Sequence, residues 1–170
     1  EIYESFVYDQ PHAVALGKYE NSIIVNGFSK THAVPGWRTG FAIGPRRVLS
    51  EMLKIQQYSF VCAPSIAQWG LTAGFDVDLS SKVAEYRQKR DFVYDAIRGK
   101  YEVELPGGAF YLFPKAPGGS GAQFFEKCIA RELMIIPGNV FSCVDTHFRI
   151  SYAAPQSVLE RGVEVLLSLV

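Results

Sequence analysis

Three side chains in one short segment, NGFSKTHAVPGWRTG (26–40), have the types and the spacing to hold a phosphorylated aldehyde. Lys30 offers an amine, which in its neutral form attacks a carbonyl carbon and forms a Schiff base. Arg38 offers a permanently charged planar fork that suits a phosphate. Ser29 offers a hydroxyl donor beside the lysine. Because a Pro-Gly pair turns the chain between them, we expect Arg38 to swing back toward Lys30.

Two apolar runs enclose this segment and are expected to position it. NSIIVNGFS (21–29) is rich in β-branched residues and is bounded by Asn and Gly, and RTGFAIG (38–44) follows the turn. Both patterns predict strands. Lys30 is therefore predicted to lie in the loop between two strands.

Helical spacing dominates the next part of the chain. Helices are predicted over 45–60 and 63–75, and a long polar helix is predicted within 78–101. Because a long polar helix between apolar blocks can connect two domains, we place the domain boundary at residue 76. The expected domains are 1–75 and 76–170.

The second domain is predicted to mix short strands with helices. The segment 101–116 indicates two strands around a Pro-Gly-Gly turn, and 121–134 indicates a helix. A strand over 147–153 precedes a final helix. Strands that alternate with helices indicate an α/β architecture, with a smaller α+β part behind it.

A second candidate for chemistry is Arg149, in the strand segment FRISYA (148–153). Residues alternate between the two faces of a strand, so Arg149 and Ser151 are expected to face away from the apolar residues between them. A buried arginine needs an anionic partner, because an unpaired buried charge is costly. That partner is either a carboxylate of this chain, in a structural ion pair, or a bound anion.

Composition excludes several classes of protein. Hydrophobic residues make up 48% of the 170 and charged residues 20%, which is globular composition. Seventeen basic residues balance seventeen acidic ones, so charge gives no case for nucleic acid or an anionic membrane. No apolar run approaches the ~20 residues of a membrane span. The three cysteines form no CxxC pair, which favours a reducing compartment.

The histidines give no metal site by their spacing, so no metal is predicted. His12 and His147 have no metal-like spacing with a carboxylate or a cysteine. His32, two residues after Lys30, is interpreted as a residue that shapes the loop rather than as a proton carrier.

The Ser-Lys…Gly-x-Arg-x-Gly pattern of residues 29–40 resembles the pyridoxal-phosphate lysine loop of the class I and II aminotransferases, the aspartate-aminotransferase-like family. Three further motifs follow the family's order, and the resemblance covers nearly the whole chain: EIY at 1–3, GAFY at 108–111 and PGNVF at 137–141. The resemblance implies the PLP-dependent transferase fold type I, in part. The end of the large-domain sheet would occupy 1–75, and the linking helix and α+β small domain would occupy 76–170. Both ends of the chain are interpreted as cuts within a longer enzyme.

The resemblance also implies roles for five residues. Lys30 would carry pyridoxal 5'-phosphate and move the proton during the reaction. Ser29 and Arg38 would hold the cofactor's phosphate, and Tyr3 would donate to the cofactor's ring hydroxyl. Arg149 would take the substrate's α-carboxylate as a bidentate pair.

The implied function is an aminotransferase that moves an amino group between an L-amino acid and a 2-oxo acid, as a cytoplasmic homodimer without nucleic-acid or membrane partners. Two alternatives stay open. β-Lyases, decarboxylases and synthases use the same fold and the same lysine. The fold also occurs as a non-catalytic sensing domain of transcription regulators.

Overall fold

The computed structural model describes residues 1–170 and divides into two compact units, Glu1–Ser80 and Ser81–Val170. We call these the first and the second unit. The division falls at the start of α3 (Ser80–Ile97), the long helix that was expected to connect two domains, and it lies close to the expected boundary at residue 76. The assignment of the units to the two domains of a larger enzyme stays a prediction.

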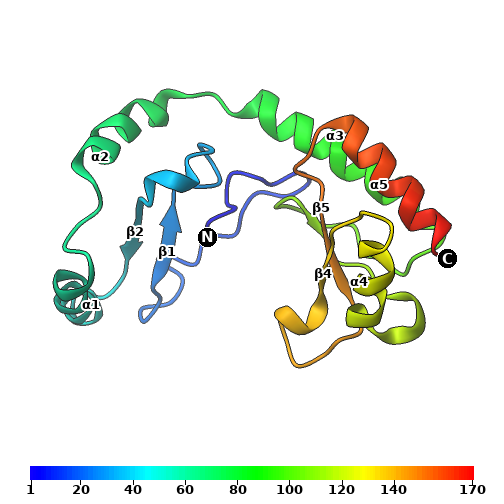
Figure 1. Ribbon diagram of the computed structural model, residues 1–170. Helices are drawn as coiled ribbons and strands as arrows, with labels where there is room; N and C mark the ends of the chain where they lie inside the picture. Colours follow the sequence, from blue (N-terminus) through cyan, green and yellow to red (C-terminus); the bar gives the residue numbers. More distant parts are fainter. The chain divides into compact units, whose positions relative to one another are not determined.

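A β-hairpin forms the sheet of the first unit (Figure 1). β1 (Ile24–Gly27) pairs antiparallel with β2 (Gly40–Ile43), and Gly27 lies opposite Gly40. Both strands form within the predicted segments. The pattern is local: β-branched and aromatic residues favour the extended backbone, and the glycines end it.

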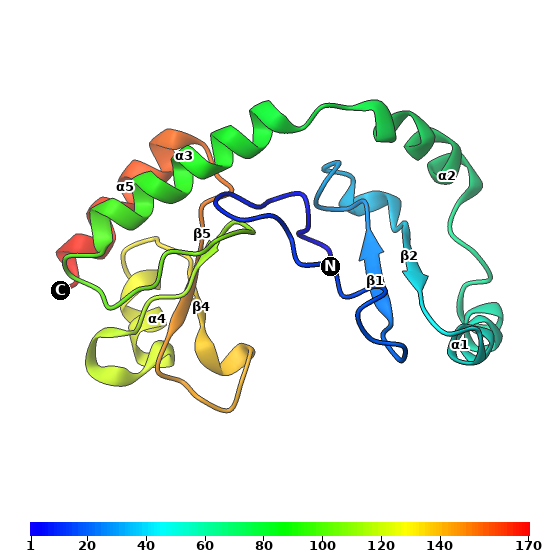
Figure 2. The ribbon, with the colours of Figure 1, turned by 180° about the vertical axis from the view of Figure 1, so that it is seen from behind.

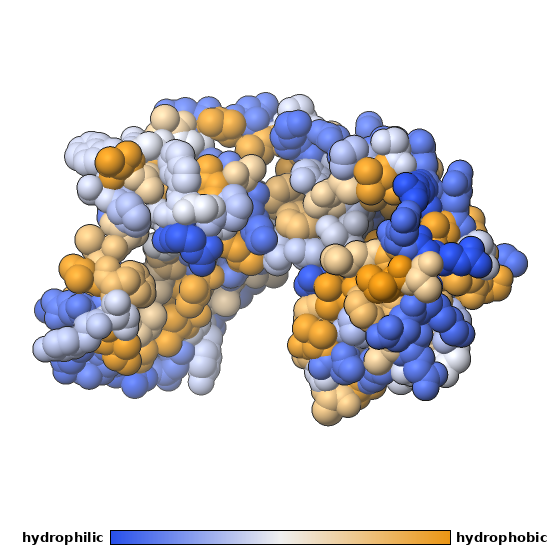
Figure 3. Space-filling view, in the orientation of Figure 1, coloured by the Kyte–Doolittle hydropathy of each residue, from blue (hydrophilic) through white to orange (hydrophobic).

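Two helices follow the hairpin, as predicted. They are α1 (Arg46–Ser59) and α2 (Ser65–Thr72), and a short 3₁₀ turn, η2 (Ala73–Asp76), takes the last residues that were predicted to belong to α2. Large apolar side chains of the first unit stay exposed, among them Val25 of β1 and Phe41 of β2. Figure 3 shows apolar areas in the part of the molecule that contains β1, β2 and α1. Exposed apolar residues on strands are typical of a sheet that is buried on both faces in a larger assembly.

The second unit contains a three-stranded antiparallel sheet in the order β3-β5-β4. Its strands are β3 (Tyr111–Leu112), β4 (Ile136–Pro137) and β5 (Phe148–Ser151). Only one of the two strands predicted over 101–116 forms, because residues 101–105 find no partner strand. Lys115 N–H donates to the carbonyl of Glu102 at 2.9 Å, but no ladder follows from this bond.

Helices cover this sheet and build the core of the second unit. α3 and α5 (Gln156–Ser168) lie side by side in both views (Figures 1 and 2). The largest fully buried side chains come from the helices, from β3 and β5 and from residues next to the strands: Tyr152, Phe124, Phe148, Ile97, Leu112, Ile135, Leu166 and Val93. α4 (Gly121–Ile129) is shorter than the predicted 121–134, since Glu132 adopts a left-handed backbone with φ of 60°. None of these helices combines the length and the apolar character that a membrane span requires.

Asp145 holds the N-terminus of α4 in place. Each oxygen of its carboxylate lies 3.1 Å from the backbone N–H of Ala122, and one accepts the hydroxyl of Ser120 at 2.8 Å. These bonds, first that from Ala122, hold the pKa of Asp145 below its ordinary value of 3.8. Because Asp145 lies three residues before β5, the contact fixes the chain that leads into the strand of Arg149.

We expect Asp145→Asn to lower the midpoint of thermal unfolding at neutral pH. The difference between the midpoints of variant and wild type should close below about pH 4. The pKa is lower in the folded than in the unfolded chain, so the ionised carboxylate stabilises the fold above the unfolded value. That contribution is lost as the pH falls through the folded pKa. A pH series of thermal melts measures the gap. Asp95→Asn is the control, because Asp95 pairs with Arg98 at the exposed surface of α3. A gap that stays constant with pH would contradict the role of Asp145.

Candidate functional site

The hairpin places Ser29 and Arg38 at its loop end, where the Lys30 loop begins and ends. The strand pairing continues past the sheet, since Phe28 N–H donates to the carbonyl of Thr39 at 3.4 Å. Ser29 and Arg38 are the next residues along the two antiparallel segments. Lys30 directly follows Ser29, so β1 and β2 place all three predicted residues at one end of the hairpin.

The Lys30 side chain is half-buried, and its amine makes no hydrogen bond or ion pair in the first unit. The Ser29 hydroxyl is half-buried as well and has no partner there. A surface lysine without a functional role would be expected to be exposed or paired with a carboxylate. The local environment therefore leaves this amine available.

Arg38 adds a second uncompensated positive charge at the same end of the hairpin. Its side chain is exposed, and its guanidinium donates to the carbonyl of Pro35 at 3.0 Å, without any carboxylate partner. Its backbone is left-handed, with φ of 51°, which is uncommon for a residue other than glycine. Two basic groups and a hydroxyl that no carboxylate pairs with fit an anionic group such as a phosphate.

Two contacts with the helical segment brace the Lys30 loop. A Cβ on Gly70 of α2 would lie 3.0 Å from the Trp37 indole, so the ring packs against that glycine. His32 Nε2 lies 3.0 Å from the carbonyl oxygen of Gly74, and since a carbonyl only accepts, Nε2 carries the proton. Gly70 and Gly74 were not identified from the sequence, where each is one glycine in a helical pattern. His32 thus acts in loop structure, as interpreted.

The close approach of β1 and β2 at the loop end of the hairpin requires glycine at position 40. A Cβ there would lie 2.7 Å from the carbonyl oxygen of Asn26, an atom that β1 holds in place. We expect Gly40→Ala to lower the free energy of unfolding by about 1–3 kcal/mol, because the strands must separate to admit the methyl group. Chemical denaturation measures this. Gly36→Ala is the matched control, since a Cβ at Gly36 meets nothing within 4 Å. Equal stability of the two variants would contradict the close approach.

Tyr3 lies in a turn of residues 2–5, which packs beside β1. The N-terminal amine of Glu1 donates to the carbonyl of Val25 at 2.7 Å, and the Ile2 side chain lies 3.3 Å from the position of a Cβ on Gly27. The structure therefore places the segment of Tyr3 next to the loop end of the hairpin. The role of Tyr3 toward a cofactor stays a prediction.

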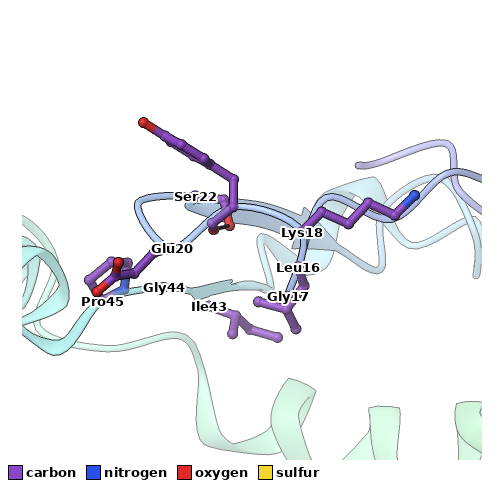
Figure 4. Close-up of a pocket in the computed structure, with 9 residues that line it drawn as sticks. Leu16, Gly17, Lys18, Glu20, Ser22, Ile43, Gly44 and Pro45 are labelled. Carbon is purple, nitrogen blue, oxygen red and sulfur yellow. Dashed lines mark hydrogen bonds between the residues drawn. The ribbon is translucent and has the colours of Figure 1, made fainter.

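Three pockets lie in the first unit, and Ser29, Lys30 and Arg38 line none of them. One of about 240 Å³ is bordered by Phe28, Thr31 and His32, and one of about 430 Å³ is bordered by Phe28, Gln56 and Cys62. The third, of about 340 Å³, forms where residues 16–22 meet the end of β2. Figure 4 shows that the side chains of Lys18 and Glu20 point away from each other at this pocket, so the pocket does not bring the amine and the carboxylate together.

The structure also brings together Glu1, Glu4 and His12, which sequence spacing did not connect. One ligand atom from each lies within 4.8 Å of the others. His12 Nε2 lies 3.4 Å from a Glu1 carboxylate oxygen, and the N–H of Ala15 holds the pKa of Glu1 below its usual range. Spacing along the sequence gave no metal-like pattern for His12, because the fold and not the local sequence brings the two carboxylates to it.

Arg149 of β5 lies on the face of the sheet opposite the core, as the alternation predicts. Its neighbour Phe148 is buried, whereas Arg149 is half-buried. The carbon at the centre of its guanidinium lies 4.5 Å from the ring centroid of Tyr111 and 4.5 Å from that of Phe141. No carboxylate of the second unit pairs with it. The strand pattern left a carboxylate of the chain or a bound anion as partners, and a bound anion at Arg149 stays a prediction.

Two residues of this site were not identified from the sequence. Tyr111 lies in a motif to which we assigned no chemistry, and Phe141 lies in the PGNVF element, which served only as a spacing marker. Aromatic residues near an arginine carry no periodic signal, so only the sheet order reveals the contact.

Comparison with known proteins identifies the family. The sequence profile of "Aminotransferase class I and II" matches residues 1–166. A probable aspartate aminotransferase of Methanocaldococcus jannaschii is 32% identical over 98% of this chain and 47% of its own length. A probable N-acetyl-LL-diaminopimelate aminotransferase of Bacillus subtilis is 34% identical over 98% of this chain and 44% of its own length. The chain thus spans about half the length of these relatives.

Solved structures agree with this result. The aspartate aminotransferase of Thermotoga maritima superposes with a TM-score of 0.91 at 28% identity, over 99% of this chain and 46% of its own. A Methanococcus jannaschii protein with an active site similar to that of kynurenine aminotransferases superposes with a TM-score of 0.92 at 31% identity, over 99% of this chain and 48% of its own. The chain therefore belongs to the class I and II aminotransferases, and its α/β fold is the corresponding part of the PLP-dependent transferase fold type I.

Proposed function

We propose that the full-length protein is a pyridoxal 5'-phosphate-dependent aminotransferase that moves an amino group between an L-amino acid and a 2-oxo acid. Family membership supports this reaction, since the relatives named above are aminotransferases. The observation that carries the proposal is the half-buried residue Lys30, whose amine has no partner, at the same end of the hairpin as Ser29 and Arg38.

The residues at the hairpin fit the cofactor. Ser29 and Arg38 offer a hydroxyl and a guanidinium for the phosphate, and no acidic side chain competes for them. Lys30 supplies the amine for covalent attachment, and Tyr3 supplies a hydroxyl for the cofactor's ring oxygen. When bound, pyridoxal 5'-phosphate supplies an electron sink that stabilises negative charge on the substrate's Cα.

The side chains of this chain then have separate tasks. Lys30 Nζ, once neutral, takes the proton from the substrate's Cα, because a positioned amine is an effective base. Arg149 binds the substrate's carboxylate through two parallel N–H bonds and so orients the Cα–H bond. Arg38 and Ser29 hold the phosphate, so the cofactor is not released during the reaction.

One incubation separates this function from its alternatives. The full-length protein is mixed with pyridoxal 5'-phosphate, a panel of L-amino acids and 2-oxoglutarate. Glutamate is expected to form, with one 2-oxo acid released per glutamate. Pyruvate with ammonia, or release of carbon dioxide, would instead indicate a β-lyase or a decarboxylase. A sensing domain would release none of these products.

We also propose a cytoplasmic homodimer. All three cysteines are free, which supports a reducing compartment. Exposed apolar side chains on α2, notably Ile66 and Trp69, support association with further protein surface. Light scattering of the full-length protein measures the mass, and a monomer at micromolar concentration would contradict the dimer.

A further inference from the structure

The side chain of Arg149 contacts two aromatic rings, one from a neighbouring strand of its sheet and one from the segment after the other neighbouring strand. β5 is the central strand, with β3 on one side and β4 on the other. Tyr111 belongs to β3, and Phe141 follows η4 (Gly138–Val140), the turn that continues β4. Both ring centroids lie 4.5 Å from the guanidinium carbon.

Rings and a carboxylate use different parts of a guanidinium. The rings attract the cation through their negative faces and pack against its planar surface. A carboxylate binds in the plane, along the N–H edges. No carboxylate of the second unit occupies those edges in Arg149. The 4.5 Å distances fit ring contacts of this kind, which leave the hydrogen-bonding edges available for a carboxylate.

Backbone contacts fix where the two rings lie. Tyr111 pairs with Ser151 in the register of β3 and β5. Phe141 N–H donates to the carbonyl of Gly138 at 2.9 Å, and the Phe141 ring meets that of Phe113 edge-on, with centroids 6.2 Å apart. Both residues are thus held by contacts other than those with Arg149, and their rings can restrict the arginine before substrate arrives.

We propose that Tyr111 and Phe141 are positioning residues that hold the Arg149 guanidinium ready for the substrate's α-carboxylate. This inference rests on the proposed function. A long flexible side chain loses conformational freedom when it binds, and a cation that is already confined loses less. The two rings therefore strengthen carboxylate binding without touching the substrate's reacting atoms.

The test compares a carboxylate with its uncharged amide in the full-length holoenzyme. Inhibition constants are measured for 3-phenylpropanoate, propanoate and acetate and for the corresponding amides, together with kcat and KM for the best amino acid of the panel. The variants are Phe141→Leu and Tyr111→Leu, with Phe141→Tyr and Tyr111→Phe as versions that keep the ring. Tyr94→Leu is the matched control, because it removes a ring that lies 5.8 Å from the guanidinium carbon of another arginine of the second unit, Arg98.

Each leucine variant is expected to raise the KM and the carboxylate inhibition constants about three- to tenfold, with kcat within about twofold and amide binding unchanged. The versions that keep the ring are expected to retain wild-type values. In an Arg149→Met background, Phe141→Leu should have no further effect, because the cation that it positions is gone. A role in folding alone would instead lower the melting temperature and leave the preference for carboxylates intact.

Two failures can be told apart. If Arg149→Met abolishes the preference for carboxylates but both leucine variants keep it, the positioning role is overturned and the proposed site stands. If the wild type itself shows no preference for a carboxylate over its amide, Arg149 is not the carboxylate site, and both proposals about this arginine fall.

Discussion

Replacement of Lys30 by alanine is expected to lower kcat of the full-length enzyme by at least about 10²–10⁴-fold, the contribution of a positioned acid–base group. Loss of covalent attachment adds to this effect, since the loop between β1 and β2 contains no other lysine. The half-buried position and the absence of a partner for Lys30 are the structural reasons for expecting this. Steady-state kinetics with saturating pyridoxal 5'-phosphate measures the loss.

Two further variants sharpen the test of Lys30. Lys30→Arg keeps a cation but removes the nucleophilic amine, so it should be as inactive as the alanine variant. Lys18→Ala removes an exposed lysine whose amine points away from the nearby pocket, and it should behave as wild type (Figure 4). Borohydride treatment followed by peptide mapping should label Lys30 in the wild type. A label on another lysine, or activity of Lys30→Ala within tenfold of wild type, would contradict the assignment.

Arg149→Met is expected to lower kcat/KM by about 10²–10⁴-fold, because two hydrogen bonds to a charged carboxylate contribute about 1.5–3 kcal/mol each. Methionine has a similar length and fills the space between the two rings, so packing is largely kept. The loss should appear for the amino acid and for the 2-oxo acid alike, since both carry the same carboxylate. Kinetics of both half-reactions measures it.

The control for Arg149 lies in the same unit. Arg161 pairs with Glu132 at the exposed surface, with nitrogen and oxygen 2.6 Å apart, and Arg161→Met should change kcat/KM less than twofold. Arg149→Lys keeps the charge without the planar fork, and it should fall between wild type and Arg149→Met. If Arg149→Met loses thermal stability but keeps kcat/KM, the arginine has a structural role only.

Sequence alone determined the local parts of this protein. The hairpin of β1 and β2, the loop of Lys30 and the helices α1, α2, α3 and α5 follow from composition and periodicity, which act over a few residues. The face of Arg149 follows from strand alternation. The motif around Lys30 was sufficient to indicate the family, because its serine, lysine, arginine and glycines lie close together in the chain.

Only the tertiary structure decided which distant residues meet. Phe141 and Tyr111 flank Arg149 because of the strand order β3-β5-β4, and His32 reaches the carbonyl of Gly74 across 42 residues of sequence. The strand predicted within 101–105 is absent because strands require a partner, which no local pattern reports. Periodicity states which face a side chain occupies. The residue across from it depends on register and packing, which are set by the whole fold.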